Sequence, residues 1–262
     1  MQDMTRHWIT ELLLVLTLAA CLPMAAVAQP AKPPTMQARI AVAANFADAA
    51  RKLAADYAKQ SGQKIEISSA STGKLYAQIV SGAPFDALLS ADAETPRKLV
   101  DAGLADASTL HDYATGRLVL WSRDPARVTD GEALLRKGPI ERLAIANPDL
   151  APYGAAAREV LQHVRRWEEL KPRLVMGENI NQASQFVITG AAPLGLLPRS
   201  LAMEANRKHR GSSWEIPAAW HAPIVQSAVL LKRGERNPAA RGFLVYLRSP
   251  AAQKQIRNFG YD

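Results

Sequence analysis

Amide and hydroxyl side chains stand at two turns that follow predicted strands. Asn45 follows the apolar run of residues 40–44, and Ser71-Thr72 follow a strand predicted over residues 64–69. These side chains supply neutral N–H and O–H donors. The first turn of a helix adds backbone N–H groups that have no acceptor within the helix and can bind an anion. Donors gathered in this way favour binding an anion over acting on one.

The turn at Asn45 belongs to a strand-turn-helix unit that spans residues 39–62. Its apolar run predicts a buried strand, and Asn45 stands where a helix N-cap is expected. The predicted helix ends at Gly62 and places four side chains on one apolar face: Phe46, Ala50, Leu53 and Tyr57. Asn45 could also act as a cap alone, so its role stays open between capping and ligand binding.

A second unit of the same kind spans residues 143–164. It has an apolar strand over residues 143–146, a polar turn and an amphipathic helix. Two such units predict two α/β lobes whose helix N-termini face each other across a cleft. Strands alternate with helices elsewhere too, which favours α/β lobes with largely parallel sheets. Ligands of such sheets bind at the carboxyl ends of the strands.

The remaining elements predict where the chain passes between the lobes. The first lobe is expected over residues 37–118 and 224–262, and the second over residues 119–223. Asp92 is expected to cap a helix, and Asn237 to open one of two closing helices. The other predicted strands cover residues 87–90, 118–121, 174–176, 194–197 and 224–231.

Composition indicates an ordinary globular protein, and its basic charge suits several kinds of anionic partner. The 262 residues are 48% hydrophobic and 21% charged, and 32 Lys and Arg against 24 Asp and Glu give a net charge of +8. A basic balance suits nucleic acid, an acidic membrane or a small anion. No basic helix stripe is interleaved with aromatic residues, and the basic run 207–210 is expected in a solvated loop. Nucleic acid is therefore not an expected partner.

The N-terminal segment predicts export. Basic Arg6 precedes the apolar run 12–20, which is too short to span a bilayer, and Ala26-Val27-Ala28 forms a cleavage site. We expect a signal peptide over residues 1–28, a proline-rich flexible leader over 29–36, and a soluble periplasmic product. The single cysteine, Cys21, lies inside the signal peptide, although its context also resembles a lipobox, so a lipoprotein anchored through Cys21 is the alternative.

The residue patterns of common enzyme and cofactor sites are missing. The histidines are scattered without HExxH spacing, and there is no GxSxG elbow or glycine-rich dinucleotide turn. Thr72-Gly73-Lys74 lacks the flanking residues of a P-loop. With no cysteine left after cleavage, thiolate sites and disulfides are excluded. We therefore expect no enzyme and no resident cofactor.

Several longer strings resemble the molybdate-binding proteins of bacterial ABC transporters. They are AVAANF (41–46), STGKLYAQIVSGAPFDALLSAD (71–92), LVLWS (118–122), IANPDLAPYGAA (145–156) and GENINQ (177–182). The resemblance implies a type 2-like periplasmic-binding-protein fold, with two α/β lobes joined by crossover strands and the ligand cleft between them. It further implies a monomer that binds molybdate, and tungstate as well, and delivers it to an ABC permease at the inner membrane.

The resemblance also implies the ligand contacts. The first turn supplies Ala44-Asn45 and the second supplies Ser71-Thr72, while Tyr153 and Ile180 stand at contacts of the two later turns. Molybdenum would be held as an oxyanion without direct protein ligands to the metal. A tyrosine that completes the site in some members falls here on Pro198, so the Asn45 and Tyr153 variant of the site is expected.

A donor-only site also predicts selectivity. A tetrahedral dianion offers only acceptors, whereas phosphate at neutral pH keeps a proton and needs an acceptor of its own. Sulfate matches in charge and can be rejected only by size, so an oxyanion such as sulfate remains an alternative ligand. Two different classes of function also stay open: a periplasmic enzyme acting on a phosphorylated substrate, and an effector-sensing domain of a transcription regulator.

Overall fold

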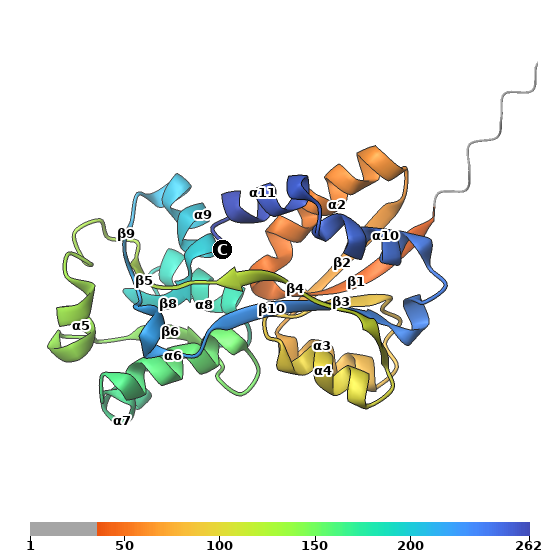
Figure 1. Cartoon of the computed structure of the whole chain (residues 1–262). Helices are drawn as coiled ribbons and strands as arrows, with labels where there is room; N and C mark the ends of the chain where they lie inside the picture. The colour runs from red at the N-terminus through yellow and green to blue at the C-terminus, as the bar shows by residue number, and fades with distance from the viewer. Residues whose placement is uncertain (1–35) are drawn as a thin grey trace, which may run out of the picture. The chain divides into compact units, whose positions relative to one another are not determined.

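The structure is a computed structural model that describes residues 36–262 (Figure 1). The predicted signal peptide, Cys21 and nearly all of the predicted leader lie outside the described residues. No helix within residues 36–262 combines the length and the apolar character that crossing a membrane requires.

Strands and helices alternate through most of the described chain. The strands are β1 (Gln37–Ala43), β2 (Lys64–Ala70), β3 (Ala87–Leu89), β4 (Ala105–Gly116), β5 (Leu118–Ser122), β6 (Leu143–Ala146), β7 (Leu174–Gly177), β8 (Leu194–Pro198), β9 (Ser212–Glu215) and β10 (Ile224–Leu231). The α-helices are α2 (Ala47–Ser61), α3 (Thr72–Val80), α4 (Glu94–Asp101), α5 (Gly131–Lys137), α6 (Pro152–His163), α7 (Trp167–Leu170), α8 (Ile180–Ile188), α9 (Arg199–His209), α10 (Pro238–Leu247) and α11 (Pro250–Asn258). The 3-10 turns are η1 (Ala44–Phe46), η2 (Lys171–Arg173), η3 (Ala218–Trp220) and η4 (Lys232–Gly234).

The strands form two five-stranded sheets, and each sheet with its helices is one lobe. The first lobe has the order β2-β1-β3-β10-β4, and the second has β7-β6-β8-β5-β9. In each sheet three neighbouring strands pair in parallel, and one reversed strand, β10 in the first sheet and β5 in the second, makes two antiparallel pairs. The predicted α/β class is confirmed, but the sheets are mixed where largely parallel sheets were expected. The antiparallel pairs arise because β10 and β5, which carry the chain between the lobes, run opposite to the other four strands of their sheets.

Two crossings join the lobes. The chain leaves the first sheet at the end of β4, and only Arg117 separates β4 from β5 of the second sheet. It returns through η3 into β10, which pairs with β4 from Ile224 opposite Gly116 onward. Figure 1 shows β4 and β10 side by side along this passage.

The first sheet is covered on both faces. Alternate residues of its strands, among them Ile40, Val42 and Leu89, pack with α2, α10 and α11. The residues between them, such as Ala41 and Leu88, pack with α3 and α4. This alternation follows from the two-residue repeat of a strand, and it explains why these strands read as continuous apolar runs.

The last residues of the chain are tied to the first crossing. Asp262 exchanges two backbone hydrogen bonds with Thr115, of 2.8 and 3.0 Å. Its carboxylate accepts from Arg117 and from Arg199, each at 2.5 Å. The preceding residue, Tyr261, is thereby held beside the end of β4, where the chain crosses between the lobes.

Three elements differ from the sequence-based expectations. β4 was not expected, because its polar, half-exposed sequence hides the strand period. The chain between β8 and β10 forms α9 and β9 rather than a meandering loop. The basic run 207–210 therefore lies in the last turn of α9, where cations suit the negative end of the helix dipole, and Arg210 ends the helix with a φ of 48°.

At three other helix ends, the residue predicted to start or stop the helix makes the expected local contact or backbone turn. Gly62 ends α2 in the left-handed region, with a φ of 71°. The Asp92 carboxylate accepts from the Thr95 N–H at 2.7 Å, although α4 begins at Glu94. Asn237 caps α10 by accepting from Ala239 and Ala240 at 3.0 and 3.4 Å.

We expect Asn237→Ala to lower the free energy of unfolding by about 1 kcal/mol, because it removes this cap. It also removes the bond from the Asn237 side chain to the Gln37 carbonyl. Urea denaturation measures the change. Arg236→Ala, at the exposed preceding residue, is the matched control and should leave the unfolding free energy unchanged. Equal stability of the two variants would contradict the capping role.

Candidate functional site

Helix starts from both lobes lie close together. The Gly73 N–H, in the first turn of α3, donates to the Leu150 carbonyl just before α6 at 3.0 Å. α8 contacts η1. Ala44 of η1 belongs to the same apolar cluster as Tyr153 and Ile180 of the second lobe. The four turns that contain the expected site residues therefore meet where the lobes touch.

Asn45 does not cap a helix, which corrects the sequence-based expectation. The chain first makes the turn η1, and α2 then begins after Phe46 without a side-chain cap. The Asn45 side-chain Nδ2 instead donates to Gln226 Oε1 at 2.9 Å and to the Tyr261 hydroxyl at 3.3 Å. Tertiary partners thus use the side-chain donors of Asn45. Its backbone N–H, in the first turn of η1, has no acceptor within that turn.

Ser71 and Thr72 occupy the start of α3. Ser71 is the residue before the first helical turn, and its backbone is extended. Its Oγ is buried and has no hydrogen-bond partner among the described residues. A buried hydroxyl without a partner costs free energy, so it marks a position where a ligand atom would fit. Thr72 Oγ1 accepts from the Ala91 N–H at 3.2 Å, which leaves the hydroxyl hydrogen available for donation.

Backbone bonding at α6 and α8 leaves single N–H groups unused. In α6, Pro152 has no N–H, and Gly154 and Ala155 donate to the Ala151 carbonyl. In α8, the Asn179 side chain accepts from Asn181 and Gln182 at 3.0 and 3.1 Å. Of the first-turn N–H groups of α6 and α8, those of Tyr153 and Ile180 are therefore left without an acceptor among the described residues.

Tyr153 is fully enclosed and stays neutral. Only 1% of its surface is exposed, and burial raises its pKa well above the usual value. Its hydroxyl accepts from Gln226 Nε2 at 3.3 Å. The phenol therefore keeps its hydrogen at neutral pH, and that hydrogen can be given to an acceptor.

Gly116 makes room for the Tyr153 hydroxyl. A Cβ atom at this position would lie 2.0 Å from the hydroxyl oxygen and 3.1 Å from Gln226 Nε2. No side chain fits there unless Tyr153 moves.

A buried polar network surrounds these groups, and the sequence reasoning missed most of it. Gln226 has no exposed surface, and its Oε1 accepts from both Asn45 and Tyr113, at 2.9 and 3.1 Å. The Tyr261 hydroxyl donates to the Asn45 carbonyl at 2.7 Å. One signal could have pointed to it: Gln226-Ser227 interrupts an otherwise apolar strand.

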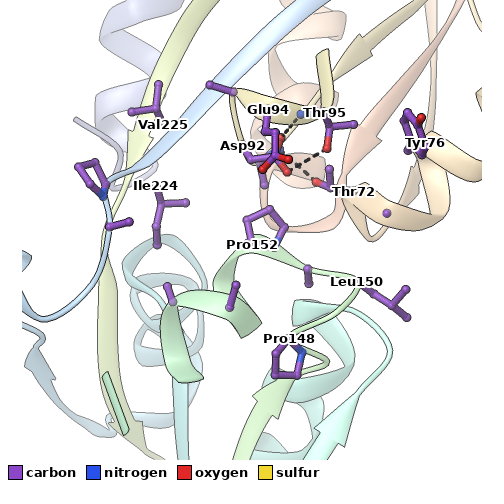
Figure 2. Close-up of a pocket in the computed structure, with 18 of the residues that line it drawn as sticks. Thr72, Tyr76, Asp92, Glu94, Thr95, Pro148, Leu150, Pro152, Ile224 and Val225 are labelled. Carbon is purple, nitrogen blue, oxygen red and sulfur yellow. Dashed lines mark hydrogen bonds between the residues drawn. The ribbon is translucent and has the colours of Figure 1, made fainter. Parts of the chain in front are cut away.

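An open cleft of about 700 Å³ lies beside the site (Figure 2). Thr72 lines it from the first lobe, and Leu150 and Pro152 line it from the second. The other expected site residues, Ala44, Asn45, Ser71, Tyr153 and Ile180, are buried and do not line this cleft. Lys74 pairs with Glu178 across the two lobes. The cleft therefore adjoins the more enclosed group of donors at Thr72.

The donor groups together suit an acceptor-only ligand. They are backbone N–H groups, two hydroxyls and one phenol, all neutral. Within residues 36–262, no three His, Cys, Asp or Glu side chains are grouped so that they could hold a metal ion. Pro198, where some related proteins are expected to carry a tyrosine, ends β8 and is buried. The geometry thus offers hydrogen bonds to an oxyanion and no direct ligand set for a metal.

We expect Gly116→Ala to lower the free energy of unfolding by about 1–3 kcal/mol, because the new methyl group displaces the Tyr153 ring. Tyr153→Phe removes the atom at 2.0 Å, so the same glycine substitution should cost less in that background. A double-mutant cycle by denaturation measures this coupling. Additive effects of the two substitutions would contradict the close approach.

We expect the unfolding free energy to fall as pH rises above 10. Burial raises the pKa of Tyr261 to about 12 and raises those of Tyr113 and Tyr153 well above 10, whereas the unfolded chain ionises near 10. Unfolding then releases protons, so stability is complete below pH 10 and is lost between 10 and 12. Denaturation at pH 8, 10 and 11 checks this. Tyr261→Phe should flatten the decline, and an unchanged slope would contradict it.

Comparisons with known proteins place the chain in a family. The family model described as bacterial extracellular solute-binding protein matches residues 38–262. The molybdate-binding protein ModA of Rhodobacter capsulatus is 45% identical over 84% of this chain and 86% of its own length. The periplasmic molybdate-binding protein of Azotobacter vinelandii has a solved structure with a TM-score of 0.82 at 37% identity, covering 86% of this chain and 98% of that one.

A more distant relative is a Bacillus subtilis protein named as a putative ABC transporter substrate-binding lipoprotein. It is 27% identical over 85% of this chain and 85% of its own length. The match of the family model to nearly all described residues, together with the identity to the first relative, shows the family. The chain belongs to the bacterial extracellular solute-binding proteins, in the same family as these molybdate-binding relatives.

Proposed function

We propose that this protein binds molybdate, and tungstate as well, as a carrier without enzymatic activity. The observation that supports it most is the set of unused neutral donors at four helix starts. Ser71 Oγ is buried without a partner among the described residues, and the N–H groups of Tyr153 and Ile180 have no acceptor in their helices. The names of the relatives that are 45% and 43% identical support the same ligand.

The proposed contacts are Ala44 and Asn45, Ser71 and Thr72, Tyr153, and Ile180. Asn45 would contribute through its backbone N–H, since Gln226 and Tyr261 accept from its side-chain amide. A dianion held by such donors gains charge-assisted hydrogen bonds, each contributing about 1.5–3 kcal/mol. No cation needs to be buried with it, which avoids the desolvation cost of a buried charge.

The wider role follows from the family. We propose that the protein works in the periplasm, as a monomer, and delivers its ligand to an ABC permease. The relative from Azotobacter vinelandii is named as periplasmic, and the one from Bacillus subtilis as an ABC transporter component. Export through residues 1–28, cleavage rather than lipidation at Cys21, and the lobe limits at residues 118 and 223 stay predictions of the sequence.

Calorimetric titration of the chain without residues 1–28 tests this proposal. We expect saturable binding of molybdate and tungstate, weaker binding of sulfate, and none of phosphate, because the proposed contacts include no carboxylate to accept its proton. Ser71→Ala and Tyr153→Phe should each weaken molybdate binding by about 10-fold or more, as expected for one charge-assisted bond.

Ser69→Ala is the matched control for Ser71→Ala, since Ser69 is an exposed hydroxyl two residues earlier. It should bind molybdate like the unaltered protein. If neither molybdate nor tungstate binds while sulfate does, the ligand is a different oxyanion. If Ser69→Ala and Ser71→Ala weaken binding equally, the site lies elsewhere.

A further inference from the structure

We infer that Gln226 is a positioning residue, which fixes the direction of the hydrogen bond at Tyr153 so that the phenol presents its hydrogen to the ligand. The inference rests on the proposed function and deepens it. Gln226 lies on β10, directly after Ile224 and Val225, which line the cleft in Figure 2. It joins a group of the first lobe, Asn45, to a group of the second, Tyr153.

A phenol can either donate or accept, and an oxyanion needs the donor. If a neighbour accepted the hydrogen of Tyr153, the oxygen lone pairs would face the ligand and repel it. In the structure Gln226 Nε2 donates to the Tyr153 oxygen at 3.3 Å. An amide N–H cannot accept, so this bond leaves the phenol hydrogen for another acceptor.

The direction of the Gln226 amide is set by a chain of bonds that starts at a fixed acceptor. The Asn45 backbone carbonyl can only accept, and it receives the Tyr261 hydroxyl hydrogen at 2.7 Å. The Tyr261 oxygen therefore presents lone pairs to the Asn45 side chain, which turns Nδ2 toward it at 3.3 Å. The same Nδ2 donates to Gln226 Oε1 at 2.9 Å, which leaves Nε2 to face Tyr153.

The surrounding groups support one orientation of the amide. The Tyr113 hydroxyl shares its hydrogen between the Ser90 carbonyl at 3.0 Å and Gln226 Oε1 at 3.1 Å. Ser200 Oγ donates to the Tyr261 oxygen at 3.1 Å, and this bond also keeps that oxygen an acceptor. A glutamine is suited to this place because it accepts at one end and donates at the other.

Gln226→Glu tests the inference because it changes the direction of one bond with little change in shape. The ionised carboxylate of this variant can only accept, so the Tyr153 hydrogen would turn to it and away from the ligand. A protonated carboxyl can donate again and imitates the amide. Burial favours the protonated form, whereas the hydrogen bonds that Asn45 and Tyr113 donate at this position favour the carboxylate, so the experiment itself locates the titration.

The three tyrosines and the histidine around this position keep their charge between pH 7 and 9. Tyr113, Tyr153 and Tyr261 have pKa values raised by burial, and burial lowers that of His111 on the adjoining strand. The charged groups that act on the network are Asp48 on Tyr261, Asp92 on Tyr113 and Arg199 on Tyr153, and Asp112 accepts from the adjacent Ser227.

The experiment measures molybdate affinity of the purified protein and of Gln226→Glu from pH 7 to 9, as a ratio at each pH. We expect the variant to bind at least about 10-fold more weakly at pH 9 and more weakly than Gln226→Met, with the ratio recovering wherever the carboxyl takes up its proton. Ser227→Ala, the adjacent buried polar residue whose hydroxyl bonds Asp112, should show a constant ratio near one. A ratio for Gln226→Glu that stays near one, or that equals the ratio for Gln226→Met at every pH, would overturn the inference.

Gln226→Met provides a second readout if the glutamate variant does not fold. It removes donor and acceptor together and leaves the phenol free to rotate, so binding should weaken by several-fold at every pH. Binding equal to that of the unaltered protein would overturn the inference. Failure of the unaltered protein to bind molybdate would overturn the proposed function together with it, and the two failures are therefore distinguishable.

Discussion

The first N–H groups of a helix have no acceptor within the helix. The candidate site depends on the few such groups that no other part of the protein accepts from. A buried N–H or O–H without an acceptor costs about 1–3 kcal/mol. At several helix starts a nearby side chain accepts hydrogen bonds from these N–H groups. Asn237 does so at the start of α10, and Asn179 accepts from two N–H groups of α8. The open donors of the site lie at the turns where the lobes meet. Their cost in the empty protein is offset when an acceptor arrives.

The same constraint explains why so much of the polar network carries no charge. A cation would attract an oxyanion more strongly, but burying it would cost desolvation free energy. Neutral amides and hydroxyls avoid that cost, provided that each one points the right way. Buried amides such as Gln226 and Asn45 then serve to orient, and the tyrosines stay protonated because burial raises their pKa values.

Local signals predicted most of the elements and the turns at Asn45 and Ser71, whereas Tyr153 and Ile180 entered the candidate site through the resemblance. The α/β class, the turns that hold Asn45, Ser71 and Tyr153, and the Asn237 cap follow from residue types within a few positions of one another. The partners of Asn45 do not, because Gln226 and Tyr261 lie 181 and 216 residues further along the chain. A capping pattern is ambiguous because distant acceptors of the side-chain N–H groups can hold the same amide in another orientation. β4 was missed for a related reason, since its partner strand, rather than its own sequence, makes it a strand.

The pairing of Thr115 with Asp262 has a practical consequence for anyone producing this protein. Asp262 holds the preceding tyrosine against Asn45, so the two residues at positions 261 and 262 act on a turn near the opposite end of the sequence. A purification tag fused directly after Asp262 would crowd its ion pairs with Arg117 and Arg199. A recombinant version trimmed by two residues would lose the hydroxyl that orients the Asn45 amide. Tags are better placed at the amino-terminal side of residue 36.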